Sequence, residues 1–289
     1  MLLASAAAFP ATLHAQEEEA PAVGPVADAP PADDPFAGSV YDGDWLSVGI
    51  GAGLVPSYTG SDDYVFFPLP VVQGQLGGIG ISPRPAGLAL DFVPAPEEGV
   101  DIDLGLAVRL RNARADQIED PVVELAGELD RAFEVGPTAG IGFSGVLNPY
   151  DSLSFNLDAR WDVAGAHDGF VIDPSVTYFT PLSRGMAASL SVGAEYADDD
   201  FNDYYFSVDA AQSLASGLPQ FQADGGFNSL GVNLLLGVDF DGDLANGGLA
   251  GFAIAGYSRL LGDAKDTPYT SVRGSADQFL GGVGIGFTF

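Results

Sequence analysis

Large apolar residues alternate with small or polar ones along most of this chain. The pattern is clearest in residues 279–289, which read FLGGVGIGFTF. Phe289 and Phe287 share one parity with the other large side chains of this run, whereas Gly286 and Gly284 fall on the other parity. Because successive side chains of a β-strand point to opposite faces, the segment predicts a strand with one large apolar face and one face of small residues.

Comparable runs cover 100–111, 132–144 and 152–164. Each is about as long as a tilted strand that crosses a bilayer, whereas strands of soluble proteins average about 5–6 residues. The apolar parity would face lipid, and charged residues of the other parity would pair inside a lumen. The pattern therefore predicts an all-β fold, a transmembrane antiparallel up-and-down β-barrel. The charged residues expected to point inward are Asp101, Asp103, Arg109, Asp158, Arg160 and Asp162.

We expect about twelve strands, an even number as in bacterial barrels, with ten or fourteen as the alternatives. The weakest segment contains Pro83 and Pro85, which predict a bulge or a split. The expected strands are 44–54, 64–74, 79–92, 100–111, 132–144, 152–164, 170–181, 186–197, 202–210, 227–240, 247–259 and 278–289.

This strand count predicts which connections share a side. With both ends of the barrel chain on the periplasmic side, the outward connections are 55–63, 93–99, 145–151, 182–185, 211–226 and 260–277. The periplasmic turns are then 75–78, 112–131, 165–169, 198–201 and 241–246.

One expected periplasmic connection contains a helix signal. Asp120 can cap a helix, Pro121 suits the first helical position, and Val122, Leu125 and Leu129 share one helical face. We expect a short amphipathic helix near 120–131, periplasmic or inside the lumen.

The first residues differ in composition from the rest. Residues 1–15 resemble the apolar part and the small-residue cleavage site of a signal peptide, without the basic segment that normally precedes them, so we expect the natural start to lie upstream or the chain to be trimmed. Residues 16–43 are rich in Glu, Asp, Ala and Pro and are expected to form a disordered periplasmic tether. The barrel is expected over 44–289.

Charge and residue types exclude several functions. A net charge of −30 would repel nucleic acid phosphates. The chain has no Cys, and His167 is the one His outside 1–15, in an expected exposed turn. Because nucleophilic catalysis needs a positioned base and zinc needs Cys or His ligands, we predict no enzyme, no catalytic residues, no metal site and no cofactor. A barrel hydrolase using His167 is the weakest alternative.

Acidic and aromatic clusters have simpler explanations. The pairs and triplets at 62–63 and 198–200 lack the spacing of a calcium loop, so we favour solvated loops over Ca²⁺ sites. Aromatic residues near the expected strand ends predict a girdle at the lipid headgroups. They are Trp45, Tyr64, Tyr178, Tyr196, Tyr204, Tyr205, Tyr257 and Phe289.

Three segments make the sequence resemble a known family. Residues 56–70 read PSYTGSDDYVFFPLP, residues 196–227 contain YYFSV, SGLP and GGF, and residues 257–279 contain RLLGDA and GSADQF. In this order they resemble the family of MltA-interacting protein and OmpV. Thr267 replaces a common Ser of that family, and the acidic tether is additional.

The matching positions have no proven role. Their glycines suit turns with positive φ and their prolines stiffen loops, so the motifs either close and plug the barrel or form a binding epitope. They are Pro56, Tyr58, Gly60, Ser61, Asp63, Tyr64, Pro68, Pro70, Tyr205, Phe206, Ser216, Gly217, Leu218, Pro219, Gly225, Gly226, Arg259, Leu260, Leu261, Gly262, Asp263, Ala264, Pro268, Gly274, Ser275 and Gln278.

The resemblance implies an outer-membrane protein of a Gram-negative bacterium. It implies partners in outer-membrane lipid and in the assembly machinery, for which Phe287 and Phe289 would be the terminal aromatic signal. It also implies a scaffold that links a murein transglycosylase to a peptidoglycan synthase. The alternative is a small diffusion channel, cation-preferring because of Asp101, Asp103 and Asp158, or an entry route for solutes or antibiotics.

Overall fold

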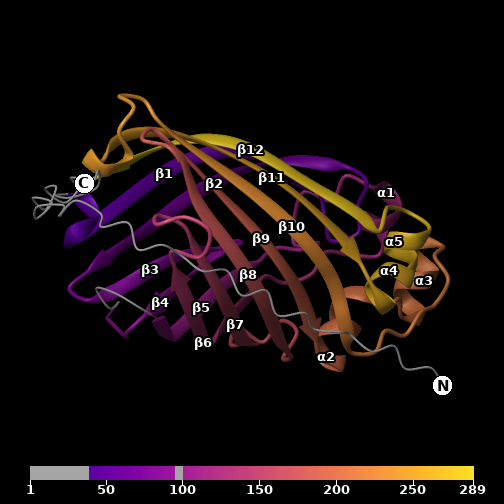
Figure 1. Cartoon of the computed structure of the whole chain (residues 1–289). Helices are drawn as coiled ribbons and strands as arrows, with labels where there is room; N and C mark the ends of the chain where they lie inside the picture. The colour runs from indigo at the N-terminus through magenta and orange to yellow at the C-terminus, as the bar shows by residue number, and fades with distance from the viewer. Residues whose placement is uncertain (1–38, 95–99) are drawn as a thin grey trace, which may run out of the picture. The chain divides into compact units, whose positions relative to one another are not determined.

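The computed structural model describes residues 39–94 and 100–289, which form a closed antiparallel barrel. Each strand pairs with its neighbours in sequence, and β1 pairs with β12 to close the barrel (Figure 1). The strands are β1 (Trp45–Pro56), β2 (Tyr64–Leu76), β3 (Ile79–Arg84), β4 (Gly87–Asp91), β5 (Val100–Arg111), β6 (Ala132–Ser144), β7 (Ser152–Asp162), β8 (Phe170–Ser183), β9 (Met186–Ala197), β10 (Gly226–Asp239), β11 (Gly248–Leu260) and β12 (Asp277–Thr288).

Short helices occupy some of the connections. They are the α-helices α1 (Pro121–Leu125), α2 (Asp199–Phe206), α3 (Ala210–Ser216), α4 (Gly262–Asp266) and α5 (Pro268–Ser271), and the 3₁₀ helices η1 (Val40–Asp42) and η2 (Leu244–Asn246). Among the described residues, no helix is long and apolar enough to span a membrane.

Glycines make the closing seam narrow. Gly49 pairs with Gly286 and Gly51 with Gly284 across β1 and β12. A Cβ added to Gly49 would lie 2.9 Å from the carbonyl oxygen of Ile285, too close for a real side chain. The small-residue parity of the last segment is therefore needed where the two ends of the sheet meet.

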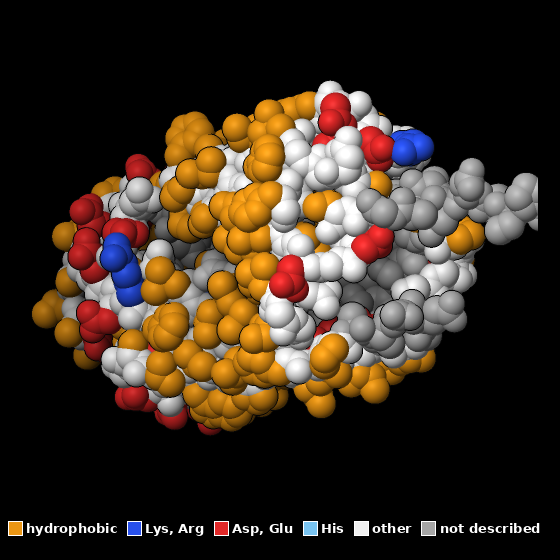
Figure 2. All heavy atoms as spheres, turned by 90° about the vertical axis from the view of Figure 1, so that its left-hand side faces the viewer, with side chains coloured by type: hydrophobic (Ala, Val, Ile, Leu, Met, Phe, Trp, Pro, Cys, Tyr) orange, Lys and Arg blue, Asp and Glu red, His pale blue; other side chains and the backbone are white. Residues whose placement is uncertain are grey.

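The outer face of the barrel carries the large apolar parity, as predicted. Ile50 and Val283 are both 65% exposed, and Figure 2 shows hydrophobic side chains gathered over the strands with acidic ones towards the edges of this face. Exposed apolar surface of this extent is stable against lipid rather than water, so the fold is a transmembrane barrel. Further exposed members are Val48, Phe66, Ile102, Leu104, Phe155, Leu157, Val192, Leu230, Ile285 and Phe287.

Two of the predicted strands are wrong, although the total of twelve holds. Segment 79–92 forms two short strands, β3 and β4, because the chain turns at Pro85 and Ala86, where Ala86 has φ 52°. Segment 202–210 is helical over Asp199–Phe206 instead. Asp198 caps this helix by accepting a hydrogen bond from the backbone N–H of Phe201, so local capping prevails over the alternating aromatics.

These two errors shift the predicted sides of several connections. We call the end of the barrel where β12 finishes the Phe289 end and the opposite end the distal end. By strand order, 55–63, 211–226 and 260–277 lie at the distal end, away from Phe289, as predicted. However, 112–131, 165–169 and 198–201 also lie there, whereas 145–151, 182–185 and the described part of 93–99 lie at the Phe289 end.

The predicted helix near 120–131 exists, but at the distal end rather than on the side of Phe289. It covers Pro121–Leu125, and the Asp120 carboxylate accepts hydrogen bonds from the N–H groups of Val122 and Val123 at 2.8 and 3.0 Å. The predicted signal peptide 1–15 and residues 16–38 of the predicted tether lie outside the described residues. The first strand begins one residue after the predicted barrel boundary at 44.

Candidate functional site: the capped lumen

The distal end of the barrel is covered by its long connections. We call residues 57–63, 112–131, 163–169, 198–225 and 261–276 the cap, which contains α1 to α5. Figure 1 shows these helices together at the end of the barrel opposite the C-terminus. Because the cap comes from five separate connections, only tertiary packing can hold it together.

One apolar cluster joins the outer parts of the cap. Tyr58, Val123 and Tyr269 are at most 2% exposed and come from three different connections. The Tyr58 hydroxyl donates to the carbonyl oxygen of Tyr269 at 3.3 Å. Ala126, Val208 and Leu218 complete the cluster.

A second cluster attaches the cap to the barrel wall. Phe201 and Phe206 of α2 pack with Val171 of β8 and Ala197 of β9, all at most 3% exposed. Leu260 and Ala264 join them from the connection between β11 and β12, together with Tyr205 and Ala223. The cap is thus continuous with the folded barrel rather than a loose set of loops.

Arg114 holds the two clusters together. Its side chain is almost fully buried, its guanidinium carbon lies 3.9 Å from the centroid of the Tyr269 ring, and it donates to the carbonyl oxygens of Tyr205 and Gly127. Burial lowers the pKa of this guanidinium, while the nearby Tyr269 opposes that shift. An arginine remains charged despite such a shift, so the aromatic ring and carbonyls replace its water.

An ion pair fixes α1 to the last cap connection. Arg273 Nη2 lies 2.7 Å from Asp120 Oδ2. Burial alone would raise the pKa of Asp120, but the hydrogen bonds from Arg273 and from the α1 backbone hold it below its usual value. The Asp120 carboxylate therefore serves as helix cap and as ion-pair partner.

The family-like motifs meet within this cap. Gln278 accepts a hydrogen bond from the N–H of Gly60 at 3.1 Å and donates to the carbonyl oxygen of Ser61 at 3.0 Å. The N–H of Ser275 donates to the Gly60 carbonyl at 2.9 Å. Asp263 accepts a hydrogen bond from the N–H of Asp224 at 2.8 Å. Segments distant in sequence are therefore joined by their motif residues.

Most predicted positions lie in the cap or at the strand ends beside it. These are Pro56, Tyr58, Gly60, Ser61, Asp63, Tyr64, Tyr205, Phe206, Ser216, Gly217, Leu218, Pro219, Gly225, Gly226, Arg259, Leu260, Leu261, Gly262, Asp263, Ala264, Pro268, Gly274, Ser275 and Gln278. Pro68 and Pro70 are instead exposed within β2, and Phe287 and Phe289 lie at the other end of the barrel. Tyr204 and Tyr205 belong to α2, so their predicted place in an aromatic girdle is wrong.

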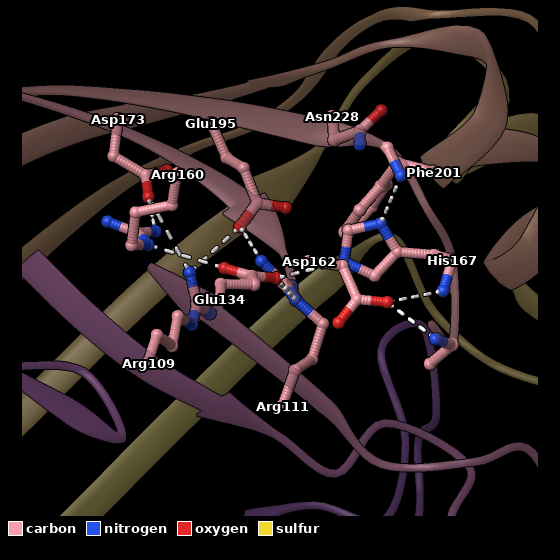
Figure 3. A network of polar contacts seen from close by, with 12 residues as sticks. Arg109, Arg111, Glu134, Arg160, Asp162, His167, Asp173, Glu195, Phe201 and Asn228 are labelled. Atoms are coloured by element: carbon pink, nitrogen blue, oxygen red, sulfur yellow. Dashed lines mark hydrogen bonds and ion pairs between the residues drawn. The ribbon is translucent and has the colours of Figure 1, made fainter. Parts of the chain in front are cut away.

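Beneath the cap, charged side chains cross the lumen. Arg111 lies 2.7 Å from Glu134 and 2.9 Å from Glu195, and Arg109 lies 3.1 Å from Glu195. Figure 3 shows these side chains pointing toward one another from separate strands. We call this set the lumen ladder; it consists of Arg84, Arg109, Arg111, Glu134, Asp158, Arg160, Asp173 and Glu195.

The lumen ladder has as many carboxylates as guanidinium groups. Arg160 pairs with Glu134, Asp158 and Asp173, and Arg84 lies 2.9 Å from Asp158. Glu134 is fully buried, so its charge is tolerated only because arginines surround it. The prediction that Arg109, Asp158 and Arg160 pair inside the lumen is confirmed. Glu134, Asp173, Glu195 and Arg84 were not predicted, although the first three share the inward parity of predicted strands.

His167 is buried, so the prediction of an exposed turn is wrong. Its Nδ1 accepts a hydrogen bond from the N–H of Gly169 at 3.1 Å, and its Nε2 lies 3.5 Å from Glu134. Its ring is 4.9 Å from the Phe201 ring, centroid to centroid. The α2 helix covers the turn, which explains the burial, and His167 becomes a contact between the cap and the lumen ladder.

The acidic clusters make backbone contacts in the cap. The Asp198 carboxylate caps α2, and Asp199 accepts a hydrogen bond from the N–H of Gly225 at 2.6 Å. Across the described ranges, no group of three or more His, Asp or Glu residues is arranged to hold a metal ion.

Comparison with known proteins yields one family. The family model described as MltA-interacting protein MipA matches residues 48–289. A search of curated proteins gave no match. The crystal structure of a doubly substituted variant of OccD1 (OprD) is similar over 87% of this chain and 98% of that chain, at 10% identity and a TM-score of 0.27. A similarity at that score adds nothing to the fold described above.

Proposed function

Because the chain belongs to the MltA-interacting protein MipA family, we propose that it is a non-enzymatic scaffold in the outer membrane of a Gram-negative bacterium. Its partners would be a murein transglycosylase and, through it, a peptidoglycan synthase. The apolar outer face of the barrel and its antiparallel topology support the membrane location.

The observation that carries the proposal is the packed cap. Two apolar clusters and the lumen ladder lie across the distal half of the barrel, where a diffusion channel needs a continuous water-filled path. A closed barrel cannot serve as a general pore, but it can anchor a binding surface to the membrane.

The surface available to murein enzymes is at the Phe289 end. Bacterial barrels have short turns on the periplasmic side and long loops outside, which assigns the Phe289 end to the periplasm and the cap to the exterior. The connection 112–131, which the sequence suggested as a partner surface, lies on the wrong side for this role. The predicted tether 16–43 stays a proposed partner element.

The turn between β6 and β7 is the best-ordered candidate surface at that end. The Asp151 carboxylate accepts hydrogen bonds from the N–H groups of Val146, Leu147 and Asn148 at 2.7 to 3.0 Å. Tyr178 also donates to Asp151, at 2.7 Å. This rigid turn leaves Leu147 79% exposed, a geometry suited to an apolar contact with a partner protein.

A pull-down with the lytic transglycosylase MltA tests the proposal. We expect the refolded protein to retain MltA and the Leu147→Asp variant to retain at least fivefold less. Leu214→Asp is the matched control, because Leu214 is similarly exposed but lies on the distal cap. Failure of the unaltered protein to retain MltA, or an equal loss in both variants, would contradict the scaffold.

The second candidate is the small cation-preferring channel. It is favoured by one observation, namely that Asp91, Asp101 and Asp103 line a cavity near the Phe289 end. Conductance measurements separate it from the scaffold, because only a channel gives current steps in a planar bilayer.

A further inference from the structure

We propose that the lumen binds a lipophilic cation, with its apolar part against the inner face of β2, β11 and β12 and its charge beside Asp91, Asp101 and Asp103. This inference rests on the barrel itself and does not depend on the scaffold function. It concerns the part of the lumen between the lumen ladder and the Phe289 end.

The first observation is an apolar inner wall. On β2 the inward residues Phe67, Leu69 and Val71 are half-buried, while Phe66 on the outer parity is 76% exposed. Inward residues of a membrane barrel are usually polar, so apolar residues on both faces of one strand are unusual. Such a wall in contact with water is costly unless an apolar group covers it.

The wall continues across the closing seam. An inward Cβ on Gly51 would lie 3.0 Å from the Phe252 ring, and one on Gly53 would lie 2.9 Å from Leu69. The glycines of β1 and β12 therefore leave room for Phe252 of β11 and Leu69 of β2 to lie flat on the wall. Together these residues form a broad apolar surface inside the barrel.

The second observation is a cavity that begins where this wall ends. The inward positions of β2 continue with Gln73 and Gln75, which line a cavity of about 300 Å³ together with Asp91, Asp101 and Asp103. Gln75 pairs with Gly80, which pairs with Asp91, so Gln75 and Asp91 lie two strands apart, roughly 10 Å. Apolar wall and carboxylates are thus within reach of one small molecule.

The carboxylates of this cavity lack a cationic partner. Asp91 Oδ1 accepts two backbone hydrogen bonds, from Leu104 and Val93. In the described part of the chain, Asp101 Oδ1 is buried without a hydrogen-bond partner. Arg84 is close enough to act on Asp103, but it pairs with Asp158.

No other part of the chain can supply the missing charge. The residues outside the described ranges, 1–38 and 95–99, contain neither Lys nor Arg. The guanidinium groups of the lumen ladder are paired with its carboxylates, which leaves no site for an anion. Charge complementarity therefore selects a cation, and the apolar wall selects a lipophilic one.

Tetraphenylphosphonium binding tests this inference. The full chain is reconstituted in phosphatidylcholine nanodiscs, with empty nanodiscs as the baseline for lipid partitioning. We expect saturable binding of about one tetraphenylphosphonium per barrel and no saturable binding of tetraphenylborate, an anion of the same shape. Equal binding of the two ions, or none of either, would overturn the inference.

Variants locate the site. We expect Asp101→Asn with Asp103→Asn to weaken tetraphenylphosphonium binding at least tenfold, and Val71→Asn to weaken it severalfold. Asp241→Asn, at an exposed turn of the same end, is the matched control and should bind as the unaltered protein does. Circular dichroism confirms folding of each variant. Unchanged affinity in the folded Asp101/Asp103 variant would overturn the inference, whereas unchanged scaffold binding there would leave the function above untouched.

Discussion

Gly60 illustrates how single residues decide whether the cap can close. Its φ of +100° is unfavourable for any residue with a side chain, and an added Cβ would clash with the hydroxyl of Thr270. Its N–H and carbonyl bind Gln278 and Ser275. A glycine is therefore required where the first and last cap connections meet.

We predict that Gly60→Ala destabilises the protein by about 1–3 kcal/mol through backbone strain. Urea unfolding of the refolded protein in bilayers measures the change. Gly226→Ala is the control, because an added Cβ there meets nothing within 4 Å and the backbone is not strained. Equal stability of the two variants would argue against a tightly packed cap.

Residue-scale chemistry also explains what the sequence could not predict. Glu134 has the correct inward parity, but its partners Arg111, Arg160 and His167 come from distant positions. Alternation assigns a side chain to a face of the sheet, whereas pairing depends on strand tilt and on the cap above. The lumen ladder could thus be predicted as a kind of environment and not as a set of contacts.

At the scale of elements, alternation predicted the long strands well. Segments such as 100–111 and 132–144 match β5 and β6, because each lipid-facing strand must repeat its apolar parity across the bilayer. It failed at 202–210, where alternating aromatics in YYF are compatible with a helix whose Phe201 and Tyr205 are buried. Helix capping by Asp198 was the signal that could have corrected this prediction.

The β1–β12 seam allows a direct test of closure, because the chain has no cysteine. Ser47 and Thr288 face each other, with their hydroxyl oxygens 2.5 Å apart. We predict that Ser47→Cys with Thr288→Cys forms a disulfide under mild oxidation, visible as altered gel mobility. Ser47→Cys with Gly286→Cys, two positions out of register, should stay reduced. The opposite result would mean a different register or an open sheet.

At the scale of the whole molecule, the two ends of the barrel differ. The distal end carries the long, packed connections and the Phe289 end carries short turns. Sidedness could not be taken correctly from the sequence, because one missed hairpin and one false strand preserved the strand count while they moved the connections between them. The motifs at 211–226 and 260–277 escaped this error, since both mistakes precede them.

Labelling of single cysteines in cells tests this orientation. We predict that Leu214→Cys, on the cap, reacts with a membrane-impermeant maleimide in intact cells. Leu147→Cys, on the turn at the Phe289 end, should react only after the outer membrane is permeabilised. The reverse pattern would place the cap in the periplasm and make 112–131 a partner surface after all.

Single-channel conductance of the refolded barrel, without residues 1–15, tests the central claim most directly. The packed cap and the paired lumen ladder predict that protein shown by circular dichroism to be folded gives no current steps in a planar bilayer. Stable, cation-selective steps would contradict the account, because they would require an open path through the lumen.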